Sequence, residues 1–138
     1  MRILLTVLML LSAMGAMAGM AAAQSLPAGK WQLDEYKFGA TTEHPLKGVA
    51  TTLLIKPNGN LGGNTGCNAY GGSYSGEKGK LAITDIISTM RACDEPTTTF
   101  ERDFFNTLQS AASANVKGST LTIKDAKGHY LHFIRSDK

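Results

Sequence analysis

The sequence predicts a mainly β, α+β domain built from an antiparallel, barrel-like curled sheet with one packed α-helix. Three observations lead to this class. Short segments in which apolar and polar residues alternate recur along most of the chain, which is typical of half-buried strands. The connections between them are too short for parallel crossovers. Only one segment, around Phe100–Leu108, has a helical period, so a single helix is expected to cover the curled sheet.

An export signal is predicted over residues 1–23. Arg2 supplies a basic start, Ile3–Leu11 begins the apolar run, and Ala21–Ala23 offers the small residues of a cleavage site. We therefore expect cleavage after Ala23, leaving residues 24–138 as a single, monomeric domain that is periplasmic or secreted. The strongly apolar part is shorter than the roughly 20 residues of a spanning helix. No membrane span is expected after cleavage, and no lipid-modified N-terminus, since no cysteine lies near the cut.

The charge pattern argues against nucleic-acid binding. The chain carries 14 Lys and Arg against 11 Asp and Glu. The lysines are scattered through turns such as Gly76–Lys80 and Asp125–Gly128, whereas nucleic-acid binding usually needs a clustered basic stripe. We interpret these charges as a solvated surface.

The first half of the domain is predicted to be strands joined by turns. Lys30–Tyr36 alternates and predicts a strand, followed by a loop over Phe38–Gly48 that is rich in Gly, Pro and polar residues. Ala50–Lys56 is a β-branched strand. Pro57–Asn60 places Pro and Asn-Gly in turn positions, a strong hairpin signal, and Leu61 starts the return strand.

The glycine- and asparagine-rich stretch Gly62–Tyr74 follows. This composition indicates a backbone that turns through positive φ, where a Cβ would clash. Ala69–Ser75 is expected to continue as a strand, and Lys80–Ile87 reads as another.

The helix has its own start signal. Thr98 and Glu101 have the spacing of a capping box, in which the hydroxyl serves an amide of the first turn and the carboxylate reaches back. Pro96 suits the first turn or the lead-in. An apolar stripe then recurs at helical spacing, formed by Phe100, Phe104, Leu108 and Ala111 or Ala112.

The chain ends in a predicted hairpin. Ser119–Lys124 alternates through Leu121 and Ile123, Asp125–Gly128 turns, and His129–Arg135 returns.

The two cysteines, Cys67 and Cys93, are predicted to form a disulfide, because paired cysteines in an exported chain usually do. In the chain-entropy model this bridge would close a loop of about 27 residues and remove roughly 3.5 kcal/mol of denatured-state freedom. The alternative is a reactive thiol at Cys67, which would need a helix N-terminus or a cation to lower its pKa. Lys56 and Arg91 are the nearest cations in the sequence.

These motifs resemble the META domain, the family of the heat-shock protein HslJ, over essentially all of residues 24–138. Family-like elements are Trp-x-Leu at Trp31, Gly-x-x-Gly-Cys-Asn, Gly-x-Tyr, Thr-x-x-x-Cys, a helix carrying Glu and an aromatic C-terminal strand. The corresponding residues here are Trp31, Gly63, Gly66, Cys67, Asn68, Gly72, Tyr74, Thr89, Cys93 and Glu101. The chain departs from relatives that have Met-Ala-Cys, since Arg91 precedes Ala92 and Cys93. The resemblance implies a small β-rich domain in the envelope or secreted, linked to stress or antibiotic tolerance, and supplies no accepted enzymatic activity.

No catalytic or cofactor site is predicted. Ser73 lies in a glycine-rich sequence close to a nucleophile elbow, but the last Gly of that motif and the following helix are missing. Gly63–Gly66 lacks the Gly-Lys-Ser/Thr ending of a phosphate loop. Asn64 and Asn68 are expected to bond nearby backbone groups.

No metal site is predicted either. His129 and His132 are three apart on a strand and should face opposite sides, and His44 lies in a distant loop. Zinc needs three or four convergent ligands. We also expect Glu101 to be a capping residue rather than a general acid, and the Phe100/Phe104/Leu108 stripe to be core.

Three functions remain open. The first is a non-enzymatic envelope domain that binds a protein partner or an apolar small molecule, held in a cavity between sheet and helix. The alternative is an exported protease inhibitor, in which a free segment Gln24–Gly29 enters a protease cleft. The third is a hydrolase or thiol enzyme that uses Ser73 or Cys67.

Overall fold

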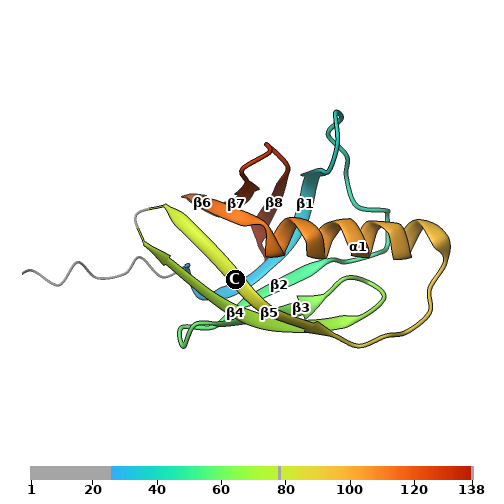
Figure 1. The fold of residues 1–138 in the computed structure, drawn as a ribbon, viewed down its shortest axis with the longest axis horizontal. Coiled ribbons are helices and arrows are strands. Elements are labelled where there is room, and N and C mark those ends of the chain that lie inside the picture. The colour runs from blue at the N-terminus through green and yellow to red at the C-terminus, as the bar shows by residue number, and fades with distance from the viewer. Residues whose placement is uncertain (1–25, 78, 138) are drawn as a thin grey trace, which may run out of the picture.

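The computed structural model describes residues 26–77 and 79–137, which form a closed antiparallel β-barrel with one helix (Figure 1). This confirms the predicted fold class. The predicted signal over residues 1–23 lies outside the described residues. The eight strands are β1 (Gly29–Lys37), β2 (Thr52–Ile55), β3 (Asn60–Asn64), β4 (Ala69–Glu77), β5 (Lys80–Ser88), β6 (Ala111–Lys117), β7 (Thr120–Asp125) and β8 (Tyr130–Arg135).

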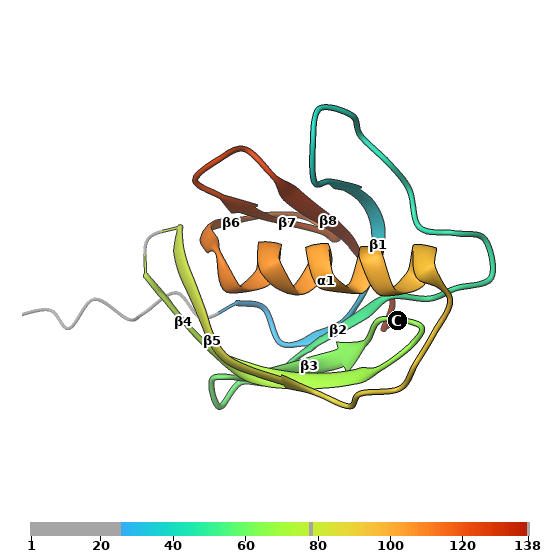
Figure 2. The ribbon, with the colours of Figure 1, turned by 45° about the vertical axis from the view of Figure 1, so that its right-hand side comes forward.

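The barrel closes where β1 pairs with both β2 and β8, so that Trp31 lies opposite Leu53 on one side and Arg135 on the other. Strand pairing is least extensive between β5 and β6, where the described register is the single pair Lys80 and Ser113. The single helix α1 (Glu95–Gln109) connects these two strands and contacts β5, β7 and β8. In the view of Figure 2 it runs between β6, β7 and β8 on one side and β3, β4 and β5 on the other.

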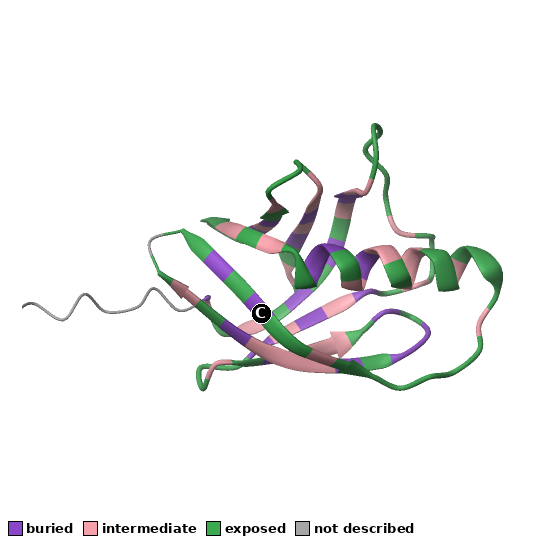
Figure 3. Ribbon diagram, viewed as in Figure 1, coloured by how far each residue is buried: buried purple, intermediate pink, exposed green. Residues whose placement is uncertain are grey.

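The core follows the predicted alternation. Buried residues alternate with exposed or intermediate ones along the strands in Figure 3. In the C-terminal hairpin the fully buried residues are Leu121, Ile123, Leu131 and Phe133, and those between them are intermediate. The helix contributes Phe104 and Leu108, which are also fully buried. The Phe104 ring packs edge-on against Tyr70, with ring centroids 5.6 Å apart. The predicted core stripe is therefore correct for these helix residues.

The predicted capping box is wrong. The helix begins one turn earlier, with Asp94 as its N-cap, and the Asp94 side chain accepts a hydrogen bond from the Thr97 N–H at 3.2 Å. Asp is among the preferred N-cap residues, and Pro96 occupies the first turn, where its missing N–H costs nothing. Thr98 and Glu101 therefore lie inside the helix, and Glu101 is available for a different contact.

The helix also ends sooner than its apolar stripe suggests. It stops at Gln109, and Ala111 begins strand β6, which pairs with β7 along its length. Ala and Asn are weak strand formers, which is why a segment reading Ala-Ala-Ser-Ala-Asn gave no strand signal. Within the described residues, α1 has neither the length nor the hydrophobicity of a membrane-spanning helix.

The turn between β3 and β4 requires glycine at Gly66. Its φ is +93°, and a Cβ built there would lie 2.3 Å from the Cγ1 atom of Val49. Gly118, in the turn between β6 and β7, also has a positive φ, +60°, but nothing lies within 4 Å of its would-be Cβ. An alanine at Gly118 therefore tests the cost of the left-handed backbone alone, whereas an alanine at Gly66 adds the cost of a steric clash.

Gly66→Ala should lower the free energy of unfolding by about 2–4 kcal/mol, because it adds a steric clash to the cost of a left-handed backbone. Gly118→Ala should cost about 1–2 kcal/mol from the backbone alone. Urea unfolding followed by circular dichroism measures both. Equal losses in the two variants would contradict a tightly packed turn against Val49.

Candidate functional site

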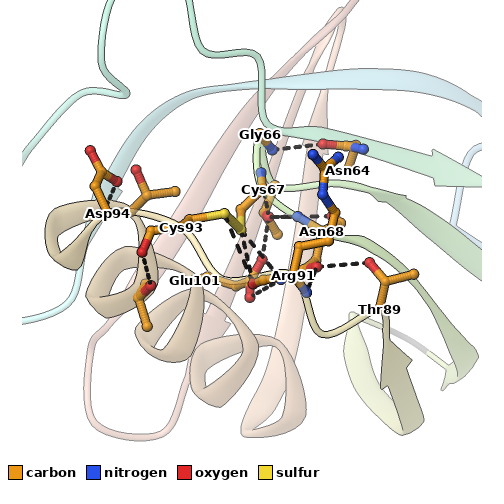
Figure 4. Close-up of a disulfide and its surroundings, with 12 residues drawn as sticks. Asn64, Gly66, Cys67, Asn68, Thr89, Arg91, Cys93, Asp94 and Glu101 are labelled. Carbon is orange, nitrogen blue, oxygen red and sulfur yellow. Dashed lines mark hydrogen bonds between the residues drawn. A yellow bond between two sulfur atoms is a disulfide. The ribbon is translucent and has the colours of Figure 1, made fainter.

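The disulfide predicted between Cys67 and Cys93 is present and joins the β3–β4 turn to the segment that leads into α1 (Figure 4). Cys67 is buried, at 7% exposure. A reactive thiol at Cys67 is therefore not available in this state, because the sulfur is bonded to its partner. The covalent link fixes the start of the helix relative to the sheet.

Asn68 connects three segments through one side chain. Its Oδ1 accepts hydrogen bonds from the Thr89 hydroxyl at 2.8 Å and the Arg91 N–H at 2.7 Å. Its Nδ2 donates to the Glu101 carboxylate at 2.8 Å. Asn68 was predicted to bond nearby backbone groups, and most of its partners are instead distant in the sequence. Asn64 does behave as expected, since its side chain accepts a bond from the Gly66 N–H at 2.7 Å.

Glu101 is a long-range anchor rather than a cap. Its second carboxylate oxygen accepts a hydrogen bond from the Thr65 hydroxyl, which is fully buried. The Thr65 hydroxyl in turn accepts from the Cys67 and Asn68 N–H groups at 3.2 and 3.1 Å. None of the ion pairs within residues 26–77 and 79–137 involves Glu101. The helix is thus tied to the turn by two charge-assisted hydrogen bonds, which are stronger than neutral ones.

An apolar cleft of about 250 Å³ lies beside this cluster, between the N-terminal half of α1 and the loop that joins β1 to β2. The helix wall includes Thr99, Phe100 and Asp103, and the loop wall includes Leu46 and Val49. In Figures 1 and 2 this loop passes the N-terminal half of the helix. The cleft thus opens at the side of α1, whereas the space under its centre is filled by Phe104 and Leu108.

Aromatic rings form one side of the cleft. Tyr36 stacks on Phe38 with ring centroids 4.5 Å apart and meets Phe100 edge-on at 5.1 Å. Burial, together with a hydrogen bond to Glu43, raises the pKa of Tyr36 to about 12. Its hydroxyl therefore stays protonated at ordinary pH. Two backbone hydrogen bonds of 2.8 Å between Tyr36 and Glu43 also tie the loop to β1.

Two buried threonines line the inner part of the cleft, one just before β2 and one in the β3–β4 turn that holds the disulfide. Thr51 and Thr65 both line the cleft and are almost completely buried. The Thr51 hydroxyl donates to the Thr65 carbonyl at 3.1 Å. Because Thr65 also bonds to Glu101, the cluster that anchors the helix sets the position of the cleft floor.

A larger depression of about 600 Å³ lies near the opposite end of β4 and β5. It is wide open, and its wall includes the exposed residues Glu77, Lys80 and Ala82. A shallow surface of this kind removes little of a ligand from water. The cleft beside α1 is less open and mainly apolar, so it is the better candidate site.

The remaining candidate residues stay apart. Ser73 lies in the middle of β4, paired with Asn60 and Thr84 rather than on a strand-to-helix turn. His129 bonds to Asp125 and His132 to Thr122, each at 2.7 Å. In the described part of the chain no group of three or more His, Cys, Asp and Glu residues is arranged to hold a metal.

The N-terminal segment predicted to be free is packed where it is described. Leu26 is a core residue with 8% exposure. The Pro27 carbonyl accepts a hydrogen bond from the buried Trp31 Nε1 at 3.3 Å, and the Ala28 carbonyl accepts one from Arg135. The free segment that the protease-inhibitor reading requires is therefore wrong for Leu26–Gly29.

The family-motif residues gather mainly at two places. Gly63, Gly66, Asn68, Thr89 and Glu101 lie at or around the β3–β4 turn, whereas Trp31 and Tyr74 are buried in the barrel. A Cβ on Gly63 would lie 2.1 Å from the Thr52 carbonyl oxygen, and one on Gly72 would meet Ile86.

Sequence reasoning missed Thr65 and the cleft-lining loop residues. The only signal for Thr65 was its place inside the glycine-rich stretch, and the sequence of the loop indicated no binding site.

Comparison with known proteins adds a family and a fold. The META domain family model matches residues 24–138. The NMR structure of a protein from Burkholderia xenovorans is similar with 26% identity and a TM-score of 0.66, covering 80% of this chain and 83% of that one. The crystal structure of a DUF4847 family protein from Bacteroides vulgatus has 12% identity and a TM-score of 0.60, with coverage of 80% and 94%. At 12% identity, the similarity to the Bacteroides vulgatus protein shows a shared fold and nothing more. A comparison with curated proteins finds no match.

Glu101→Gln should lower the free energy of unfolding by about 1.5–3 kcal/mol, because a neutral amide cannot accept from Thr65 and Asn68 together. The exposed Glu77 on β4 serves as the control, and Glu77→Gln should change stability by less than about 0.5 kcal/mol. Chemical denaturation measures both variants. If Glu101→Gln were as mild as the control, the carboxylate would not be the anchor of the helix.

Proposed function

This chain belongs to the META domain family, and we propose that it is an exported, non-catalytic binding domain whose cleft beside α1 receives an apolar side chain of a protein partner. The observation that carries the proposal is the cleft itself. It combines an aromatic side, formed by Tyr36, Phe38 and Phe100, with the rim residue Leu46, whose side chain is 63% exposed. An exposed leucine at the rim of an apolar cleft gives a partner apolar surface to cover.

The size of the cleft favours a protein partner over a free ligand. Sites for drug-sized molecules usually enclose about 300–1,000 Å³, and this cleft has about 250 Å³. Interfaces commonly place one aromatic or aliphatic anchor in such a pocket and surround it with weaker contacts. We therefore favour a single anchoring side chain over a whole bound molecule.

The non-catalytic part of the proposal is supported by the state of the candidate nucleophiles. Cys67 and Cys93 are bonded to each other, and Ser73 lies within a paired strand. An activated nucleophile needs a base within hydrogen-bonding reach. In the part of the chain that the structure describes, the Ser73 hydroxyl has no such contact.

Export is supported by two independent features. Disulfides persist mainly in oxidising compartments, and the apolar run with its Ala21–Ala23 site has the form of a secretory signal. The family match begins at Gln24, the residue after the predicted cut. We include periplasmic or secreted localisation and a role in stress tolerance in the proposal, the latter on the family resemblance alone.

We expect a short neutral peptide with one anchor, Ac-Gly-Gln-Phe-Gln-Gly-NH2, to bind the cleft. In a titration of the ¹⁵N-labelled protein, the amide signals of Leu46, Val49 and Phe100 should shift. A peptide with Gly in place of Phe should leave them unchanged, because the anchor supplies the buried apolar surface.

A blocking variant makes this test specific. Thr99 is an exposed helix residue on the cleft wall, so Thr99→Trp should fill the opening and weaken binding at least about tenfold, or about 1.4 kcal/mol. Asn106→Trp, on an exposed helix position away from the cleft, is the matched control. Binding that survives Thr99→Trp, or shifts elsewhere on the surface, would refute the cleft as the site.

Export predicts the mass of the purified protein. When the full chain is expressed in a bacterium with a periplasm, unreduced intact-mass spectrometry of the exported fraction should show a chain that begins at Gln24. Its mass should be lower by two hydrogen atoms than that of the fully reduced form, because of the disulfide. Recovery of the complete chain, residues 1–138, in the cytoplasm would count against export.

A further inference from the structure

The cleft carries negative charge as well as apolar surface. Two of its lining residues, Glu43 and Asp103, have carboxylates, and its described lining includes no Lys, Arg or His. From this juxtaposition we infer that the partner segment is basic: an aliphatic or aromatic anchor enters the cleft, and an adjacent Lys or Arg reaches Glu43 and Asp103. This inference rests on the proposed function and adds the chemistry of the occupant.

The aromatic rings support the same occupant. Tyr36, Phe38 and Phe100 line the cleft, and the part of a ring face that stacking leaves open attracts a cation within about 6 Å. The protein already uses this contact elsewhere, since the Arg135 guanidinium lies 4.6 Å from the centre of the Trp31 ring. A Lys or Arg side chain also has an apolar stem that can lie along the cleft while its charged head meets a carboxylate.

One feature of the site acts against a cation. The N-terminus of α1 points to this end of the molecule, and a helix N-terminus carries roughly half a positive charge. Asp94 caps it directly, through the Thr97 N–H at 3.2 Å, and Glu95 occupies its first turn. These two carboxylates offset the positive end of the helix dipole, which carries only about half a charge.

Arg102 and Lys47 are exposed cations on the helix and the loop that form the cleft. Arg102 contacts Asp103, with its Nε 3.2 Å from Oδ1, but its side chain is 65% exposed. Exposed pairs of this kind are weak, so an incoming cation can share or replace Arg102. Lys47 is exposed on the loop and is not part of the cleft lining.

The test compares three peptides that differ only beside the anchor: Ac-Gly-Lys-Phe-Lys-Gly-NH2 and its Gln and Glu counterparts. In NMR titrations at low salt, the Lys peptide should bind about fivefold more tightly than the Gln peptide, and the Glu peptide more weakly than both. Raising the ionic strength from roughly 0.02 to 0.5 M should remove most of the difference, because salt screens exposed charges.

Variants of the two lining carboxylates, Glu43 and Asp103, test whether they cause the preference for the Lys peptide. Asp103→Asn and Glu43→Gln should each bring the ratio of the Lys-peptide affinity to the Gln-peptide affinity closer to one. Asp103→Asn is the cleaner change, because Glu43 also bonds to Tyr36. Glu77→Gln, far from the cleft lining, should have no effect.

The outcomes separate the two proposals. Equal affinities for the three peptides would overturn the charge inference and leave the apolar cleft as a binding site. Failure of every peptide to bind would overturn the proposed function and this inference with it. A preference for the Lys peptide that persists in both Asp103→Asn and Glu43→Gln would also overturn the charge inference, since the attraction would then come from another surface.

Discussion

The attachment of helix α1 to the β3–β4 turn is the constraint on which this structure depends. The disulfide holds the segment before the helix, and the Glu101 carboxylate, bonded to Thr65 and Asn68, holds the helix itself. Either link alone would leave the helix free to move. The disulfide lies outside the helix and does not fix its rotation, and the Glu101 carboxylate reaches Thr65 and Asn68 only when the helix has the right rotation. Together they fix both the position of α1 along the sheet and the face that it turns inward.

The barrel relies on this attachment because the strand pairing that closes it is least extensive between β5 and β6. Between β5 and β6 the described register is a single pair. Helix α1 connects these two strands, contacts β5 and contributes the fully buried Phe104 and Leu108 to the core. A buried Phe or Leu contributes about 1.5–3 kcal/mol relative to exposure, and this gain requires the helix to lie correctly. The polar cluster thus stabilises the fold partly through the apolar contacts that it positions.

Most strands could be predicted because their alternation is a local property, and Leu121, Ile123, Leu131 and Phe133 face the core as the pattern required. The predictions failed where two local patterns compete for one position, or where a residue's contacts are far away in the sequence. Thr98 and Glu101 have the spacing of a capping box, but Asp94 caps the helix and Glu101 serves residues that lie 33 and 36 positions earlier. Strand β6 was missed because its pairing with β7, rather than its composition, makes it a strand. The cleft has no sequence signal of its own, since three separate segments form it.

The same cluster makes the cleft a preformed site. Its floor includes Thr65, whose hydroxyl is fixed by Glu101 and by two backbone amides, and its outer loop is tied to β1 by the bonds between Tyr36 and Glu43. In the proposed function a partner would not have to order either wall, and the entropy cost of binding would fall mainly on the partner's own segment. A cleft that holds only one side chain gains little apolar area, so low ordering cost and charge complementarity must supply the rest of the affinity. This is the physical reason to expect that a basic neighbour beside the anchor decides which segments bind.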